Sequence, residues 1–205
     1  AYVMDFLTRA RDAGHPVPAA AHERGLAYLS RVLDRALPEE GLAAHLAARA
    51  YGVYVLAAAG EPRPAEARYL DEAFAGRLPG PLARAQVGAA LALAGDRERA
   101  RPLLESALAD PERSGRTDDY GSLLRDLAGA LALAGELPGA GVATADAYAR
   151  LAELAAEREW RSTQELAWLT LAARGLEPPG PLGLEVAGTE RTAPAGTLSA
   201  PVSAD

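Results

Sequence analysis

The stretch LALAG at residues 91–95 ends an almost wholly apolar run, and two further runs in the chain end in the same way. The counterparts are LAAAG at 56–60 and LALAG at 131–135, so the three terminal glycines lie 35 and 40 residues apart. Glycine readily takes the left-handed conformation that closes a helix, so each motif predicts the C-terminal end of a helix. The sequence therefore predicts three similar helices, spaced as a repeat.

Each of these runs is followed by a more charged segment with a single apolar face. A helix that is apolar all round needs neighbours on most sides, whereas a one-faced helix covers a neighbour on one side and meets water on the other. The alternation predicts an inner layer wrapped by an outer layer, in an open solenoid or a closed α/α toroid. The expected inner helices are 42–59, 81–94 and 118–134, and the expected outer helices are 65–75, 97–109 and 145–158.

Further helices are predicted at both ends of this repeat. Residues 2–13 and 19–36 are expected to form a helical pair. STQE at 162–165 has the spacing of a capping box and begins a helix that runs to about residue 174. Glycines inside the inner helices cost helix propensity, so they predict close approach between helices; they are Gly52, Gly88 and Gly129.

Composition changes after Leu176. EPPGP at 177–181 is a linker that no helix crosses, and LGLEV at 182–186 alternates apolar with other residues like a strand. What remains is too short to fold alone. The sequence therefore predicts an all-α domain at 1–176, followed at 177–205 by a linker and the first strand or strands of a truncated β-domain.

The overall composition narrows the functional classes. Apolar residues make up 49% of the 205 residues and aromatic residues only 5%, so the core must be built from Ala, Leu and Val. A net charge of −7 argues against a nucleic-acid partner, because phosphate binding needs clustered positive charge. The absence of cysteine excludes disulfides, thiolate zinc sites and a cysteine nucleophile within this sequence.

The sequence contains no apolar stretch long enough for a signal peptide or a transmembrane helix, so we expect no direct membrane insertion. It also opens at Ala1 inside an apolar helical pattern. That opening indicates a piece cut from a longer protein.

Titratable candidates for a chemical site have simpler structural explanations. His15, His22 and His45 lack a second histidine at the spacing that a zinc-binding helix needs, so structural or surface roles are expected. Asp118 and Asp119 form a tight acidic pair, but Asp118 stands where an N-cap is expected and acidic residues suit a helix N-terminus.

The remaining candidates lie around the last helix. Ser162 has no G-x-S-x-G context and no nearby histidine, so capping explains it better than nucleophilic chemistry. Trp160 and Trp168 flank this cap and are expected to be buried against the preceding outer helix. We therefore assign no catalytic, cofactor-binding or metal-binding residue, we expect no cofactor, and we predict that the chain is not an enzyme.

Four segments together resemble the thioester domain of bacterial alpha-2-macroglobulins. YVMDFLTRA and RAYGVYVLA are similar to two of its helices, STQELAWL is similar to a helix start shared with complement thioester proteins, and LEVAG falls where the domain meets its β-sandwich neighbours. These segments are residues 2–10, 49–57, 162–169 and 184–188, and their order and spacing agree with the family over about residues 1–190.

The resemblance implies an incomplete α/α toroid that belongs to a broad-spectrum protease inhibitor of the periplasm or cell envelope. The implied partners are target proteases, trapped by the full-length protein, and neighbouring β-sandwich domains of the same chain. In the family, a Cys and a Gln near the start of the domain form the reactive thioester. Neither is assigned here, so the implied role of this sequence is structural.

Two alternatives from other classes remain open at this stage. A tetratricopeptide-like adaptor that binds peptides fits the helix pairs and the interval of 35 residues, but not the interval of 40 or residues 177–205. A toroid enzyme would need an acidic or metal-lined cavity rich in aromatic residues, and the sequence has neither signature. A cut toroid also exposes apolar faces, so we expect the chain to be oligomeric or poorly stable.

Overall fold

The computed structural model describes residues 1–109, 121–137, 141–157 and 159–176, and the backbone of two strands. The helices are α1 (Tyr2–Asp12), α2 (Ala19–Leu33), α3 (Leu42–Ala58), α4 (Pro64–Phe74), α5 (Pro81–Leu93), α6 (Arg97–Ala109), α7 (Leu123–Glu136), α8 (Ala145–Ala156) and α9 (Thr163–Ala173), with a 3-10 turn η1 (Ala75–Arg77) after α4. The strands are β1 (Leu182–Val186) and β2 (Thr189–Ala193).

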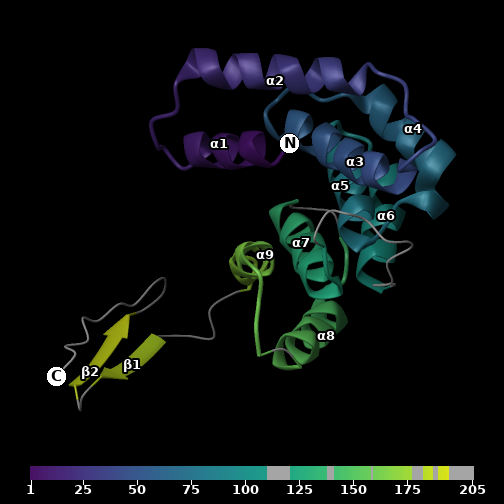
Figure 1. The fold of residues 1–205 in the computed structure, drawn as a ribbon. Coiled ribbons are helices and arrows are strands. Elements are labelled where there is room, and N and C mark those ends of the chain that lie inside the picture. Colours follow the sequence, from purple (N-terminus) through teal and green to yellow (C-terminus); the bar gives the residue numbers. More distant parts are fainter. Residues whose placement is uncertain (110–120, 138–140, 158, 177–181, 187–188, 194–205) are drawn as a thin grey trace.

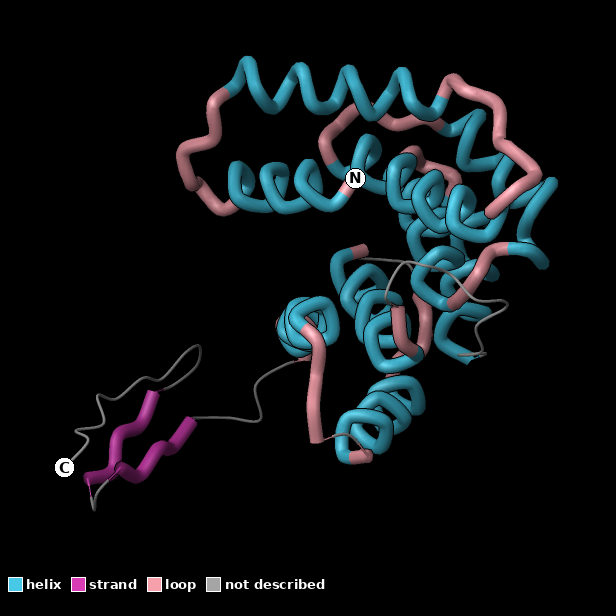
Figure 2. Tube along the Cα trace, viewed as in Figure 1, coloured by secondary structure: helices cyan, strands magenta, loops and turns pink. Residues whose placement is uncertain are grey.

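The helices form two layers, as the alternation of apolar and one-faced segments predicts. In the inner layer α1, α3, α5, α7 and α9 pack side by side in that order. In the outer layer α2 packs on α1 and α3, α4 on α3 and α5, α6 on α5 and α7, and α8 on α7 (Figures 1 and 2). The helical region is therefore an incomplete α/α toroid, in agreement with the expected fold class.

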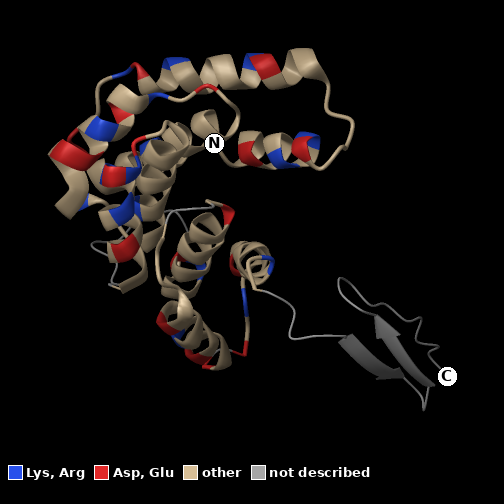
Figure 3. Cartoon of the chain, turned by 180° about the vertical axis from the view of Figure 1, so that it is seen from behind, with Lys and Arg blue, Asp and Glu red and all other residues tan. Residues whose placement is uncertain are grey.

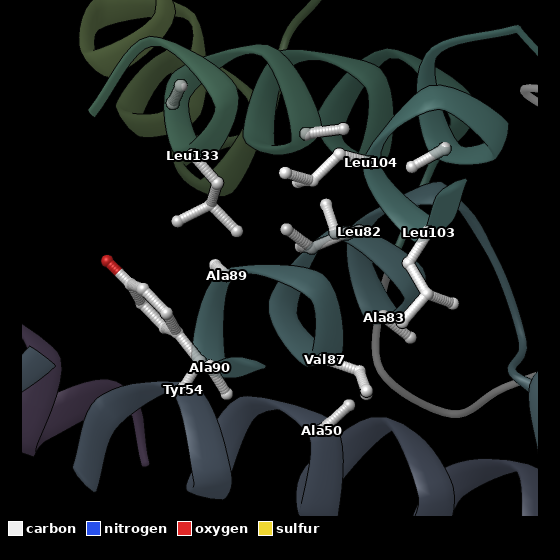
Figure 4. Packing of buried hydrophobic residues seen from close by; sticks show 14 of the residues in the cluster. Ala50, Tyr54, Leu82, Ala83, Val87, Ala89, Ala90, Leu103, Leu104 and Leu133 are labelled. Carbon is white, nitrogen blue, oxygen red and sulfur yellow. The ribbon is translucent and has the colours of Figure 1, made fainter. Parts of the chain in front are cut away.

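The core lies along α3, α5 and α7, where most residues are buried. Val53, Val87 and Leu131 have no exposed surface, and Figure 4 shows the close packing of small and branched side chains between these helices. Burying one leucine or valine contributes about 1.5–3 kcal/mol, so many such residues replace the aromatic core that the sequence lacks. The inner helices α3, α5 and α9 carry few charges, whereas charges are frequent on α1 and on the outer helices (Figure 3).

Ion pairs connect neighbouring helices of the outer layer. Arg68 of α4 lies 2.8 Å from Asp96, which immediately precedes α6. Arg99 of α6 lies 2.7 Å from Glu72 of α4. Because these side chains are partly or largely exposed, each pair contributes little stability on its own.

All three internal glycines lie where helices approach closely, as expected. A Cβ atom on Gly52 would lie 3.1 Å from a methyl carbon of Leu33 in α2. A Cβ atom on Gly88 would lie 3.1 Å from the carbonyl oxygen of Ala100 in α6. A Cβ atom on Gly129 would lie 2.5 Å from a methyl carbon of Leu82 in α5 and 3.3 Å from the ring of Trp168 in α9. Any larger side chain would push these helices apart, so glycine here sets the spacing of the layers.

Two of the three terminal glycines close their helices as predicted, and the third does not. Gly60 and Gly95 both have φ near +88°, and the following residues donate back to carbonyls of the last turn. Gly135 instead lies inside α7, which continues to Glu136. A Cβ on Gly135 would lie 3.6 Å from the Cα of Gly175, so this glycine allows α7 to cross the end of α9 closely.

Several helix boundaries differ from the sequence prediction. The helix expected to begin at Asp118 begins at Leu123, because Ser122 is extended and its hydroxyl accepts from the backbone N–H of Arg125 at 3.1 Å. Asp118 and Asp119 themselves lie outside the described residues. The helices expected at 19–36 and 145–158 end earlier, at Leu33 and Ala156.

A strand is found where the alternating pattern at 182–186 predicts one. β1 pairs with β2 in antiparallel register, with Leu182 opposite Ala193 and Val186 opposite Thr189. The expected linker at 177–181 lies outside the described residues. Among the helices that are described, none combines the length and the apolar character needed to cross a membrane.

Candidate interaction groove

A groove of about 740 Å³ lies between α1 and α9, the first and last helices of the inner row. Among the described residues, each of these two helices packs against an inner helix on one side only: α1 against α3, and α9 against α7. The groove is mainly apolar, and its lining includes Tyr2, Phe6, Ala10, Val17, Tyr51, Ala167, Trp168 and Leu171.

The exposed face of α1 follows from its sequence. Its buried face carries Met4, Asp5 and Thr8, which pack toward α2 and α3. Tyr2 and Phe6, one turn apart on another face, are 58% and 66% exposed. Large apolar side chains exposed together on one helix are typical of a surface that packs against another protein segment.

A polar cluster beneath the groove joins α1 to α3 and α7. Arg9 donates to Asp5 at 2.8 Å and to the hydroxyl of Tyr54 at 2.8 Å, and it forms a two-pronged ion pair with Glu136. The hydroxyl of Tyr51 donates to the second oxygen of Asp5 at 2.7 Å. The side chain of Asp5 is buried, so these partners compensate for its lost hydration.

The surroundings raise the pKa values of three members of this cluster, namely Tyr51, Tyr54 and Arg9. Burial raises the pKa of the Tyr51 hydroxyl above its ordinary value, and the charge of Asp5 raises it further. Burial also raises the pKa of Tyr54, where Arg9 acts in the opposite direction and Glu136 in the same one. For Arg9, burial alone would lower the pKa, but the hydrogen bond to Glu136 and the neighbouring negative charges raise it overall. Fixed donors and acceptors of this kind clamp helices together and are not suited to proton transfer at neutral pH.

The capping box at the start of α9 is confirmed and extends to a second helix. The backbone N–H of Ser162 donates to Glu165 at 2.6 Å, and the backbone N–H of Glu165 donates to the Ser162 hydroxyl at 3.2 Å. The other oxygen of Glu165 accepts from the hydroxyl of Ser122, the N-cap of α7, at 2.5 Å. Ser162 is thus occupied in capping, and one buried carboxylate joins the starts of two inner helices.

The three histidines lie apart from one another. His22 is buried and hydrogen-bonds to the Thr8 hydroxyl at 3.0 Å, so it connects α2 to α1. His15 is exposed at the edge of the groove, and His45 is exposed on α3. Within the described residues, no group of three or more His, Cys, Asp or Glu side chains is arranged to hold a metal ion.

The two tryptophans differ from each other. Trp168 is buried, with its ring centroid 6.4 Å from that of Tyr51, so it packs toward α3 rather than against the preceding outer helix. Trp160 is 85% exposed, which contradicts the expectation that it is buried. It lies in the connection before α9, outside the helix that packs against the core.

Sequence reasoning missed the Arg9 cluster. Its one local signal is the spacing of four residues between Asp5 and Arg9, which places them on one helix face. Glu136 lies 127 residues away in the chain, so only the curvature of the inner layer brings it to Arg9.

Comparison with known proteins identifies the relatives of this fold. No protein-family profile matches the chain. The alpha-2-macroglobulin of Escherichia coli K12 is 35% identical over 192 residues, which cover 86% of this chain and 11% of that protein. Salmonella alpha-2-macroglobulin reacted with methylamine superposes with a TM-score of 0.76 at 30% identity, over 94% of this chain and 13% of that one. The chain belongs to the bacterial alpha-2-macroglobulin family.

Trypsin-activated alpha-2-macroglobulin from E. coli is also similar, with a TM-score of 0.69 at 31% identity over 94% of this chain and 14% of that one. The present chain thus spans only about a tenth of the length of its alpha-2-macroglobulin relatives. The resembling segments at 2–10, 49–57 and 162–169 fall on α1, α3 and the start of α9, which are all inner helices. This family membership favours the toroid over the tetratricopeptide alternative.

Proposed function

We propose that the chain is a segment of a bacterial alpha-2-macroglobulin-like protease inhibitor, in which it forms part of the wall of an α/α toroid. The observation that carries the proposal is the match in both sequence and fold over most of the chain. The role proposed for the segment itself is structural. Its buried polar groups act as caps and helix-to-helix clamps, and the sequence has no cysteine with which to form a thioester.

We propose two units along the chain. Residues 1–176 belong to the thioester-type toroid, and residues 177–205 contain a linker and the first strands of a β-sandwich domain. The antiparallel pairing of β1 with β2 supports the second unit, because a two-stranded hairpin needs further strands to be stable.

The groove between α1 and α9 is proposed as the surface on which the rest of the parent protein packs. Phe6 of α1 lines the groove and is 66% exposed, and Leu171 of α9 lines it from the other side, so a further inner helix packed here would bury both. Neighbouring domains of the same protein are therefore proposed as the direct partners of this segment.

Proteases are proposed as partners of the full-length protein, in the periplasm or cell envelope. Support comes from the E. coli relative, whose solved structure is described as trypsin-activated. Cleavage of an exposed segment by the protease would then trigger closure around it, with no turnover by this chain.

Trypsin trapping by the natural full-length protein tests this proposal. After incubation with trypsin, hydrolysis of a large protein substrate is expected to fall strongly, while hydrolysis of a small chromogenic peptide continues. A trapped protease is shielded from large substrates but keeps its active site. If both substrates are cleaved at the rate of free trypsin, the proposal is wrong. As a control, residues 1–205 alone are expected to leave both rates unchanged.

A further inference from the structure

A small pocket of about 260 Å³ lies at the N-terminal ends of the inner helices, on another side of Tyr51 and Trp168 from the groove. The first turns of α3, α5, α7 and α9 all contribute to it. Its walls include the side chains of Ala44, Ala48 and Trp168. The pocket is thus apolar around most of its circumference.

One buried polar side chain in this pocket is left without a protein partner. Gln86 of α5 is only 3% exposed and lines the pocket, and none of the hydrogen bonds found among the described residues involves its side chain. A side chain this deeply buried normally has a hydrogen-bond partner, whereas the amide of Gln86 opens onto the space of the pocket. The amide of Gln86 therefore points to a ligand in the pocket.

The start of α5 borders the same pocket and has no side-chain cap. Its N-cap is Gly80, whereas α7 and α9 begin with the capping serines described above. Leu82 and Ala83 in the first turn are 7% and 5% exposed, so water reaches this helix end poorly. Pro81 has no N–H and the N–H of Arg84 donates to Gly80, so the free donors of this helix start are the N–H groups of Leu82 and Ala83; with the partial positive charge of the helix N-terminus they favour an anionic oxygen.

The charged side chains that border the pocket compensate each other. Arg125 donates to Asp126 from two nitrogens, at 2.8 and 2.6 Å, and to the amide oxygen of Gln164 at 3.1 Å. The amide oxygen of Gln164 is thereby engaged, which leaves its NH2 group as the end available for donation. The pocket thus combines hydrogen-bond donors with apolar walls and little net charge.

We propose that this pocket binds a small aliphatic carboxylate, either as a free acid or at the end of a Glu or Asp side chain. The carboxylate accepts from the amide of Gln86 and from the start of α5, and its carbon chain packs against Ala44, Ala48 and Trp168. Since one water occupies about 30 Å³ of liquid volume, the pocket suits a group of only a few carbon atoms. Such a site is independent of the protease trapping proposed above.

Trp168 provides a reporter, because it borders the pocket and the chain contains just one other tryptophan. In the variant Trp160→Phe, sodium butyrate is expected to change the emission of Trp168 saturably. Sodium chloride at the same ionic strength and neutral butyramide are expected to have no such effect. A butyrate titration without a saturable change, or an equal response to butyramide, would overturn the proposal.

Two substitutions in the Trp160→Phe background locate the effect. Gln86→Met keeps the size of the side chain and removes its donors, so butyrate binding is expected to weaken at least tenfold. Gly80→Asp places a carboxylate at the N-cap of α5, so it should abolish butyrate binding and raise Tm. The control Glu153→Gln, at an exposed position on α8, should bind like the parent. Unchanged binding in folded Gln86→Met, or in folded Gly80→Asp, would contradict the assignment.

The two sources of the carboxylate are distinguished by a second ligand. Glutamate blocked at both its amino and carboxyl groups presents the side-chain carboxylate as a protein segment would. Tighter binding of blocked glutamate than of butyrate indicates a docking side chain, and tighter binding of butyrate indicates a free acid. Failure of both ligands to bind refutes the proposal.

Discussion

Asp5 and Arg9 lie one turn apart on α1, yet their importance comes from residues far along the chain. Arg9 joins Asp5 to Tyr54 and Glu136, and Asp5 also accepts from Tyr51. When one partner of a buried ion pair is removed, the stability lost exceeds the stability that the pair itself contributes, because the remaining charge stays buried without a partner. The individual residues of this cluster are therefore expected to affect stability strongly.

Replacing Arg9 by Leu tests the clamp. We expect the free energy of unfolding to fall by about 2–3 kcal/mol, less than for a fully buried pair because Arg9 is partly exposed. Urea unfolding followed by circular dichroism measures this change. The control Arg101→Leu breaks an exposed pair with Glu105 on α6 and is expected to cost less than about 0.5 kcal/mol. Equal effects of the two substitutions would argue against a clamp.

The buried tyrosines predict a loss of stability in alkali. The pKa of Tyr51 is raised in the folded state, so the unfolded chain loses this proton first as the pH rises through 10.0. Stability is therefore fully present below pH 10 and declines above it, by up to about 1.4 kcal/mol per pH unit for each such group. Urea unfolding at a series of pH values from about 8 to about 11.5, a range that brackets the ordinary tyrosine pKa, would measure how the free energy of unfolding depends on pH. Tyr51→Phe should make the slope shallower, whereas exposed Tyr28→Phe should leave it unchanged.

At the scale of the elements, glycines and caps decide how closely the helices pack. Gly88 and Gly129 sit where inner helices meet their neighbours, and Gly135 meets Gly175. Glu165 connects the starts of α7 and α9. With larger residues in place of these glycines, the apolar runs would still form helices, but the helices would pack farther apart.

Gly88→Ala is expected to destabilise the chain by about 1–3 kcal/mol, because the new methyl group would meet a backbone oxygen of α6 that has little freedom to move. Thermal and urea unfolding would both measure the loss. Gly76→Ala is the matched control, since a Cβ at that position meets open space. We expect it to be neutral or to stabilise by up to about 1 kcal/mol. Destabilisation by Gly76→Ala alone would refute this account.

On the scale of the whole molecule, the inner layer is an arc whose two end helices, α1 and α9, face an apolar groove. Exposed Tyr2, Val3 and Phe6 give α1 the surface of a helix that has one more neighbour. A surface of this kind lowers its free energy by associating with another apolar surface.

We therefore expect residues 1–205 to self-associate through this groove at micromolar to millimolar concentrations. Sedimentation equilibrium or light scattering would measure the association. Phe6→Glu is expected to shift the population to monomer, because it places a charge in the contact. Tyr28→Glu, on the exposed face of α2, should leave the association unchanged. A parent chain that remains monomeric throughout would show that the groove is not adhesive.

Much of the architecture follows from the sequence because it depends on local patterns. Apolar runs such as 91–95 predict inner helices, and STQE at 162–165 predicts a capping box that the structure confirms. These signals work because helix ends and helix faces are set by residues within a few positions of each other. For the same reason, the helix layers were predictable while Gly135 was misassigned, since a glycine at a helix crossing and a terminal glycine look alike locally.

Only the tertiary structure decided which residues form sites. The Arg9–Glu136 pair, the contact of Gly135 with Gly175 and the pocket at Gln86 all unite segments that are distant in the chain. The repeated apolar runs that end in LAAAG or LALAG were by themselves enough to predict two layers of helices. How far the layer curves depends on the close packing of many side chains at once, and that curvature brings these distant residues together.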